Sequence, residues 1–196
     1  MNVTRLIFVA VGGQGNLLAS KVLGEAALLA DIPIQMSEIH GMAQRGGVVE
    51  SAIIFGDAKS TIISDGEADV LVGFEPAETL RALIRCNSKT KVVTNLSPLP
   101  PFTVSIGKGK YPDINQLQDL INKKTGGLIP LDAVSLAKKA GNVLSVNMVL
   151  LGALMKTGIL PFGEDFVKKA IKTTTKKAFL DINLKAFDSG FEAANL

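Results

Sequence analysis

A short strand that runs into a cluster of glycines opens the chain, and it constrains the fold more than any other feature. Residues 6–11 form a continuous apolar run of strand length, which is typical of a buried parallel strand. Glycines at positions 12, 13 and 15 follow at once, and residues 16–30 then repeat apolar side chains every three or four positions, as one face of a helix requires. A buried strand, a glycine turn and a helix in this order predict an α/β fold.

The alternation of strands and helices continues along the chain. We expect further strands at 32–37, 48–55, 69–74, 91–95 and 128–130, and helices at 76–84, 114–123, 131–140, 147–156, 164–177 and 180–191. Asn147 stands at the expected start of its helix, and Gly158 lies just past its end. The first strand, helix and second strand form a βαβ unit. The pattern predicts a three-layer, Rossmann-like domain with a mostly parallel sheet and a helical C-terminus.

The length and composition fit one domain. A chain of 196 residues is long enough for one well-buried core and short for two. Hydrophobic residues make up 47% of it, with no Trp and a single Tyr, so the core consists mainly of aliphatic side chains, as in many α/β folds. We therefore expect a single domain over residues 1–196.

The charge and the apolar runs argue against two classes of partner. The net charge of +3 is mild, and no basic run is interleaved with aromatic residues, as a groove for single-stranded nucleic acid requires. The first apolar run is shorter than a secretory signal, and no stretch reaches the roughly 18 apolar residues of a membrane span. We expect no nucleic-acid partner, no membrane segment and a cytoplasmic location.

The lone cysteine, Cys86, and the lone histidine, His40, limit the metal chemistry of the chain. One thiol excludes an internal disulfide and the four-cysteine ligation of an iron–sulfur cluster. One cysteine and one histidine also fall short of a zinc site with three or four ligands. We expect no metal site here, and any cluster must lie on another chain.

The glycine turn consists of Gly12, Gly13, Gln14 and Gly15. Between a strand and a helix, glycines let backbone amides approach a phosphate at the positive end of the helix. Ala10 replaces the first glycine of the dinucleotide-binding pattern, although Glu38 follows near the end of the second strand, where an acidic residue can bind a ribose. Alternatively, the glycines only permit close packing of strand and helix. Both interpretations stay open, and Gln14 favours contact with another group.

A polar loop over residues 38–47 holds the second candidate site. Its candidate residues are His40, Gly41, Gln44, Arg45, Gly46 and Gly47. Glycines near Arg45 would let the backbone approach a partner closely. Taken singly, His40 is a hydrogen-bonded loop residue and Arg45 is a surface cation. Their clustering favours a binding role.

Two further segments suggest contacts with partners. Residues 97–101 contain three prolines and form a stiff loop, at an edge or facing a partner. A basic stretch near the C-terminus would attract an acidic ferredoxin or the phosphates of coenzyme A, unless it is simply a solvated helix face. Its lysines are Lys168, Lys169, Lys172, Lys176 and Lys177.

The glycine turn and the loop together resemble the γ-type domain of the 2-oxoacid:ferredoxin oxidoreductases. The resemblance covers nearly the whole chain and includes residues 66–69, 74–76, 98–101, 147–154 and 183–187. The His-Gly-Met sequence at residues 40–42 favours the indolepyruvate branch of that family.

The resemblance implies a division of labour between subunits. A large partner subunit would carry thiamine diphosphate, Mg²⁺ and [4Fe-4S] clusters, and this chain would bind no cofactor alone. The assembled enzyme would oxidatively decarboxylate an aryl pyruvate, pass electrons to ferredoxin and release an arylacetyl-coenzyme A and CO2. No residue of this chain is assigned a catalytic role. The loop would complete the active site or the subunit interface, and the chain would be inactive alone.

Other functions remain open at this point. One is the γ subunit of a pyruvate or other 2-oxoacid:ferredoxin oxidoreductase. Another is a self-sufficient nucleotide-binding oxidoreductase that uses residues 12–15 and Glu38. A third is a binding module without enzymatic activity. The proline loop and the basic C-terminal helices favour this alternative.

Overall fold

The structure is a computed structural model that describes residues 3–41 and 46–195. In this part of the chain, a six-stranded sheet has the strand order β2-β3-β1-β4-β5-β6. The strands are β1 (Thr4–Val11), β2 (Ile34–His40), β3 (Val48–Phe55), β4 (Ala68–Gly73), β5 (Cys86–Asn95) and β6 (Leu128–Leu131). Five of them, β1, β2, β4, β5 and β6, run in the same direction, and β3 runs opposite to them. The prediction of a mostly parallel sheet is confirmed.

The strand β3 separates the first two strands of the chain. It pairs antiparallel with both β1 and β2, so β2 forms a hairpin with β3 and does not lie beside β1. The burial of the two strands explains this order, because β3 has mostly buried side chains and β2 has mostly exposed ones. A strand with polar and exposed residues is tolerated at a sheet edge, whereas an apolar strand needs cover on both faces.

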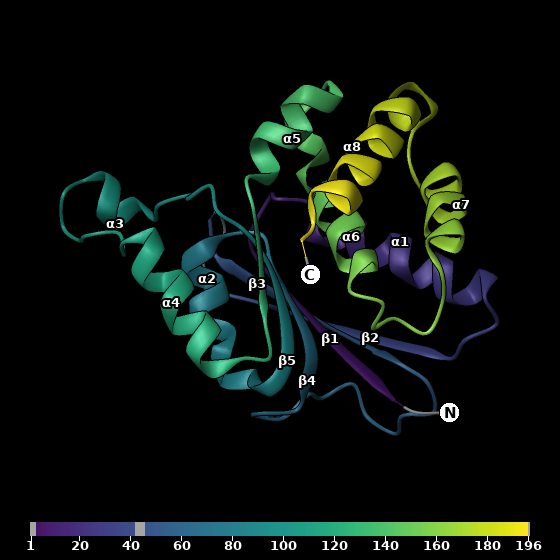
Figure 1. The fold of residues 1–196 in the computed structure, drawn as a ribbon, viewed down its shortest axis with the longest axis horizontal. Coiled ribbons are helices and arrows are strands. Elements are labelled where there is room, and N and C mark those ends of the chain that lie inside the picture. Colours follow the sequence, from purple (N-terminus) through teal and green to yellow (C-terminus); the bar gives the residue numbers. More distant parts are fainter. Residues whose placement is uncertain (1–2, 42–45, 196) are drawn as a thin grey trace.

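Helices cover both faces of the sheet, as Figure 1 shows. The helices α1 (Asn16–Leu29), α6 (Val146–Lys156), α7 (Glu164–Thr174) and α8 (Leu180–Ala193) pack together on one face. The helices α2 (Pro76–Arg81) and α4 (Ile114–Lys124) lie on the other. The remaining helices are α3 (Phe102–Ser105) and α5 (Ala133–Ala140), with 3-10 turns at Ala82–Arg85, Val143–Ser145 and Lys177–Phe179. The predicted three-layer α/β fold is confirmed.

The core has two parts because successive side chains of β1 point to opposite faces of the sheet. Phe8 contributes to the larger cluster under α1, α6 and α8, and its ring meets that of Phe74 edge to face at 5.7 Å. Ile7 and Val9 contribute to the smaller cluster, which α4 covers with Leu117. Both parts are mainly aliphatic, as the composition predicts.

Several predicted helix boundaries differ from the structure. The helix expected at 164–177 ends at Thr174 and the one expected at 180–191 extends to Ala193. The helix expected at 147–156 begins at Val146 after Ser145, and Asn147 is buried rather than standing at the N-cap. The helix expected at 131–140 begins at Ala133, because β6 extends to Leu131 in register with β5 and Asp132 caps the helix through the Ser135 amide. The helix expected at 76–84 narrows to a 3-10 turn after Arg81. Among the described residues, no helix has the length and apolarity to cross a bilayer.

Candidate functional site

A crevice forms at the carboxyl end of the parallel strands, between β1 and β4. The chain leaves β1 toward α1 on one face of the sheet and leaves β4 toward α2 on the other. In open α/β sheets, ligands bind where neighbouring strands send their connections to opposite faces. The glycine turn lies at this point, so the topology makes the crevice the candidate site.

The glycine turn is built for close packing. Gly13 and Gly15 have φ angles of 98° and 84°, a left-handed conformation that glycine adopts without strain. Gly15 is also crowded, because a Cβ there would stand 2.8 Å from Nδ2 of Asn147. That Nδ2 donates a hydrogen bond of 3.2 Å to the Gly15 carbonyl. These contacts support the packing interpretation of Gly15.

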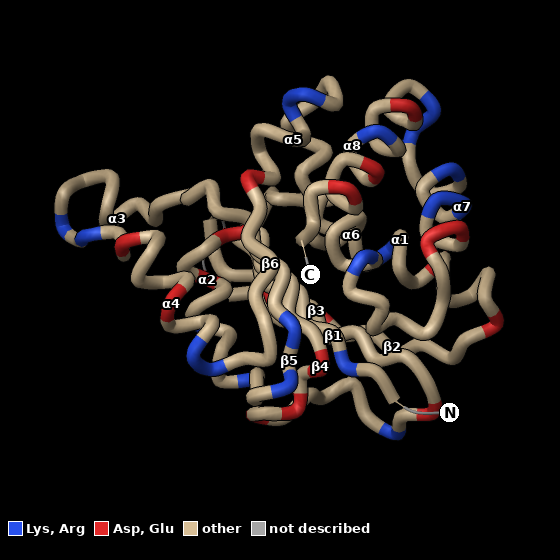
Figure 2. Tube along the Cα trace, in the orientation of Figure 1, with Lys and Arg blue, Asp and Glu red and all other residues tan. Residues whose placement is uncertain are grey.

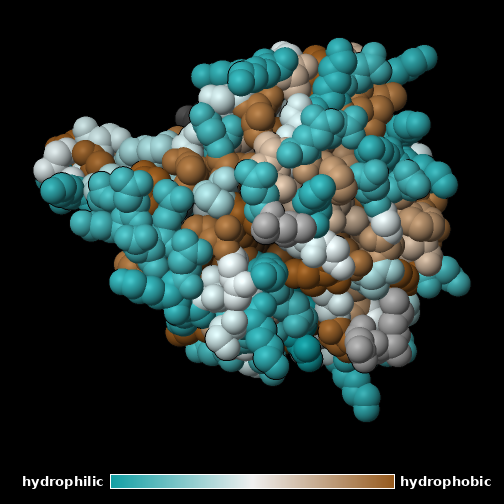
Figure 3. All heavy atoms as spheres, in the orientation of Figure 1, coloured by the Kyte–Doolittle hydropathy of each residue, from teal (hydrophilic) through white to brown (hydrophobic). Residues whose placement is uncertain are grey.

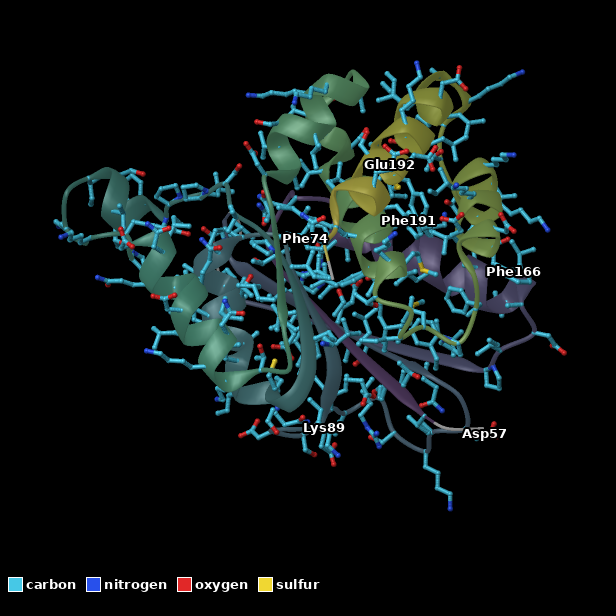
Figure 4. The ribbon with its side chains drawn as sticks, in the orientation of Figure 1. Asp57, Phe74, Lys89, Phe166, Phe191 and Glu192 are labelled. Carbon is cyan, nitrogen blue, oxygen red and sulfur yellow. The ribbon has the colours of Figure 1, made fainter. Side chains whose placement is uncertain are left out.

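Gln14 holds the ends of β1 and β4 together. Its Oε1 accepts a hydrogen bond of 2.8 Å from the Val11 amide, and its Nε2 donates one of 3.2 Å to the carbonyl of Phe74. Asn95, at the end of β5, donates to the same carbonyl at 3.1 Å. Figure 4 places Phe74 near the middle of the molecule. The contact predicted for Gln14 is therefore a contact within the chain.

Two adjoining cavities open beside the turn. The larger, of about 370 Å³, is lined by Gly13, Asn95, Leu99 and Asn147 among others. The smaller, of about 330 Å³, shares Asn147 with it, and Lys176 is among its lining residues. One lysine of the basic stretch thus lies beside the crevice. Amide and apolar groups line these cavities rather than carboxylates.

The loop over residues 38–47 joins the crevice at one end. The Gly12 amide donates a hydrogen bond of 2.9 Å to the Gly47 carbonyl, so the glycine turn and the end of the loop are in contact. At the loop's base, the Gly41 amide donates to the Val48 carbonyl at 2.8 Å. Gly46 has a φ angle of 71°. The candidates Gln44 and Arg45 lie outside the described residues.

His40 and Glu38 lie on the edge strand β2. Nε2 of His40 is 3.5 Å from Oε2 of Glu38, and both residues are exposed. Because β3 stands between β2 and β1, Glu38 is one strand further from the glycine turn than the acidic residue of a dinucleotide site. The strand order therefore argues against the alternative in which Glu38 and the glycine turn bind one dinucleotide.

A buried carboxylate that sequence reasoning did not single out lies at the N-cap of α2. Glu75 is 1% exposed. Its Oε2 accepts from the Glu78 amide at 3.0 Å, which caps α2, and its Oε1 accepts from the Leu99 amide at 3.1 Å and from the Tyr111 hydroxyl. Burial and the hydrogen bond to Glu75 raise the pKa of Tyr111, so its hydroxyl keeps the proton that it donates.

Burial also raises the pKa of the Glu78 carboxyl. The positive charge of Arg81 lowers this pKa, and the negative charge of Glu75 raises it further. Its Oε1 accepts a hydrogen bond from Arg81, and its Oε2 has no hydrogen-bond partner among the described residues. Glu78 and Arg81 thus form an ion pair between residues three positions apart in α2. Nowhere in residues 3–41 and 46–195 do three or more His, Cys, Asp or Glu side chains form a group that could hold a metal ion.

A shallow groove of about 550 Å³ runs between α1 and the edge strand β2. Leu17, Leu28 and Met36 on its walls are 49%, 68% and 45% exposed. Ser20 lies at its floor, with an Oγ that has no hydrogen-bond partner in the described part of the chain. The sequence pattern does not predict this groove, because its walls come from separate elements.

The fold and the crevice belong to a known class of protein. Residues 5–193 match the model of the pyruvate ferredoxin/flavodoxin oxidoreductase family, and the chain belongs to that family. It is 40% identical over 184 residues to the indolepyruvate oxidoreductase subunit IorB of Methanothermobacter thermautotrophicus, with 94% of each chain covered. It is also 40% identical to the IorB subunit of Archaeoglobus fulgidus, with 96% of this chain and 94% of the relative covered. The predicted resemblance is confirmed, and the chain is an oxidoreductase subunit.

More distant relatives match nearly the whole of this chain, and the solved structures among them have its fold. The 2-oxoglutarate synthase subunit KorC of Methanothermobacter marburgensis is 27% identical, over 92% of this chain and 91% of the relative. The crystal structure of a keto/oxoacid ferredoxin oxidoreductase gamma subunit from Geobacter sulfurreducens has a TM-score of 0.71 at 25% identity and covers 97% of this chain and 98% of that one. A 2-oxoglutarate:ferredoxin oxidoreductase from Magnetococcus marinus has the same fold, with a TM-score of 0.75 at 20% identity, over 99% of this chain and 31% of that longer one.

Proposed function

We propose that the chain is the small subunit of an indolepyruvate:ferredoxin oxidoreductase. The assembled enzyme would oxidatively decarboxylate aryl pyruvates with coenzyme A, giving an arylacetyl-coenzyme A and CO2, while the released electron pair passes to ferredoxin. The choice of substrate rests on a contrast in sequence identity between two groups of relatives. The chain is 38–40% identical to indolepyruvate oxidoreductase subunits, but 25–27% identical to subunits named for 2-oxoglutarate, ketoisovalerate or pyruvate.

The proposal places thiamine diphosphate, Mg²⁺ and the [4Fe-4S] clusters on a large partner subunit. The donor set of the crevice supports this division, because Mg²⁺ prefers carboxylate oxygens and clusters need thiolates. The crevice instead offers amide groups such as those of Asn95 and Asn147, which are already hydrogen-bonded within the chain. Ferredoxin and coenzyme A would bind to the assembled complex rather than to this chain alone.

The role of this chain is to complete and shape the active site at the interface with the large subunit. The loop residues His40, Gly41, Gln44, Arg45, Gly46 and Gly47 would contact that subunit or the substrate, next to the glycine turn that Gly47 already touches. Exposed apolar side chains surround the crevice and support an interface there. Leu144 is 75% exposed, Leu99 is 47% exposed and Val143 is 44% exposed, and all three line the larger cavity.

The test is expression of the chain with and without the large subunit from the same genome. The complex, but neither chain alone, is expected to reduce ferredoxin in a reaction that needs both indolepyruvate and coenzyme A. The value of kcat/KM for indolepyruvate should exceed that for pyruvate and 2-oxoglutarate by about tenfold or more. Turnover by the small chain alone would refute the division of labour, and a preference for pyruvate or 2-oxoglutarate would refute the substrate.

A further inference from the structure

A projecting segment, residues 97–113, leaves the body of the molecule between β5 and α4. We call it the arm. It contains α3 and extends to one side of the molecule, which is visible in the ribbon and in the space-filling view (Figures 1 and 3). From Pro98 to Lys110 every residue is exposed except Val104, which is half-buried. The arm therefore contributes little to the core of this chain.

Both ends of the arm are nevertheless fixed to the body of the molecule, because each of them donates a hydrogen bond to one buried carboxylate. Oε1 of Glu75 accepts a hydrogen bond from the Leu99 amide near the start of the arm and another from the Tyr111 hydroxyl near its end. The Tyr111 hydroxyl also accepts a hydrogen bond of 3.2 Å from the Ala77 amide at the start of α2. A carboxylate that is 1% exposed has few alternative partners, so the two ends are fixed in place.

The arm is also ordered internally. The Ile106 amide donates to the Phe102 carbonyl at 3.0 Å, and the Lys108 amide donates to the Thr103 carbonyl at 2.8 Å. Prolines at positions 98, 100, 101 and 112 restrict the backbone at both ends. A segment that is ordered before it meets a partner loses little conformational entropy on binding, and this favours tight association.

The surface of the arm combines apolar and basic groups. Phe102 is 75% exposed and Ile106 is 46% exposed. Lys108 and Lys110 follow, and Figure 2 shows this basic segment at the far end of the arm. Within the described residues, neither lysine forms a salt bridge. Such a surface matches an apolar recess with carboxylates at its rim.

We propose that the arm is a docking element that inserts Phe102 and Ile106 into such a recess on the large subunit. This inference rests on the function proposed above. Two observations favour the large subunit over a second copy of this chain. The root of the arm, at Pro98 and Leu99, lines the larger cavity of the crevice, so a partner on the arm also borders the candidate site. A second copy carries the same net charge of +3, which disfavours pairing through basic arms.

The first test measures the dissociation constant between the purified chain and the separately purified large subunit. Phe102→Ala is expected to raise it by about 30-fold, as the loss of a central aromatic contact does. Ile62→Ala is the matched control, because Ile62 is also 75% exposed but lies in the connection from β3 to β4, at the opposite end of the sheet. The control is expected to stay within about threefold of the wild type. The melting temperatures should match that of the wild type in both variants.

The second test reverses charge. Lys108→Glu combined with Lys110→Glu is expected to lower the association rate constant and to weaken its dependence on salt, because the arm's attraction to acidic groups is lost. Lys59→Glu combined with Lys89→Glu is the control, since these exposed lysines lie at the opposite end of the sheet. Tyr111→Phe, which releases one end of the arm, should also slow association while the chain stays folded.

The outcomes separate the two proposals. If the wild-type chain binds the large subunit and Phe102→Ala binds it as well as Ile62→Ala does, the docking role of the arm is refuted and the proposed function stands. If the wild-type chain does not bind the large subunit, the proposed function fails and the assigned partner of the arm fails with it. Formation of a homodimer that Phe102→Ala disrupts would show that the arm binds a second copy instead, and would overturn the proposal.

Discussion

The contact between α6 and α8 gives a sharp test of the fold, because two glycines let the helix backbones touch. A Cβ added to Gly152 would stand 1.9 Å from the carbonyl oxygen of Phe187 and 2.8 Å from the backbone nitrogen of Phe191. Van der Waals contact needs about 3.5 Å, so α8 would have to retreat by roughly 1.5 Å in Gly152→Ala. The obstacle is backbone, which no rotamer change can move aside. Gly190 faces α6 in the same way.

The cost of Gly152→Ala follows from two opposing terms. Overpacking of a rigid core costs about 1–3 kcal/mol and more where backbone must move, so we take about 4 kcal/mol here. Replacing glycine by alanine within a helix returns about 1 kcal/mol. The free energy of unfolding should therefore fall by about 3 kcal/mol, and the melting temperature by roughly 6–12 °C for a chain of this size.

Urea denaturation followed by circular dichroism measures this change. Gly24→Ala is the matched control, because Gly24 also lies within a helix but its Cβ would meet only the flexible end of Met36, at 3.1 Å from Cε. Met36 is 45% exposed and can shift, so the control should be neutral or gain up to about 1 kcal/mol. Equal stability of the two variants would refute the close approach of α6 and α8.

Three further changes have expected results. Asn95→Ala leaves the Ala133 and Ser97 amides without an acceptor, and the Phe74 carbonyl loses one donor. The free energy of unfolding, measured by urea denaturation, should fall by about 2–3 kcal/mol. An unchanged free energy of unfolding would contradict these hydrogen bonds of Asn95. Burial raises the pKa of the Cys86 thiol from 9.0 to about 11, so the free energy of unfolding should hold below pH 9.0 and decline as the pH rises toward 11. Cys86→Ala should flatten that decline, and an equally steep decline would exclude the thiol as its source. Arg45→Ala should keep the melting temperature and lower aryl-pyruvate turnover of the complex about tenfold, with Arg45→Lys recovering part of it; wild-type assembly and turnover would remove Arg45 from the site.

Local patterns predicted most of the helices and strands, because periodicity is set by neighbouring residues. The strand expected at 48–55 has those bounds in the structure, and the helix expected at 16–30 ends one residue earlier. The order of the strands was not predictable in the same way. The insertion of β3 between β1 and β2 depends on which strand buries more apolar surface once the sheet has formed. The sequence of one strand alone does not show how its buried surface compares with that of the other strands.

The candidate site was predictable in part. The sequence placed the glycine turn after β1 and the loop after β2, and the structure brings them together at Gly12 and Gly47. The sequence predicts Asn147 at a helix start, but its side chain binds Gly15, which lies 132 positions away in the chain and is not visible in the local pattern. The capping role of Glu75 does have a signal in the sequence. Glu75 directly precedes Pro76, which stands at the first position of a predicted helix, so Glu75 occupies the N-cap position. Its contacts with Leu99 and Tyr111 arise only from the folding of the arm. The prediction of one domain over residues 1–196 stays a prediction.

The carbonyl of Phe74 connects the parts of the molecule that the two proposals use. Gln14 from the glycine turn and Asn95 from the end of β5 both donate to it, and the next residue, Glu75, holds both ends of the arm. The turn also carries Gly12, which binds the end of the loop at Gly47. A short series of buried and half-buried hydrogen bonds thus links the end of the loop at Gly47 to the arm, and such a network is rigid when its members are satisfied. A partner that engages the arm would therefore meet the glycine turn and Gly47 at a defined distance and orientation, which is what a subunit that completes another chain's active site requires.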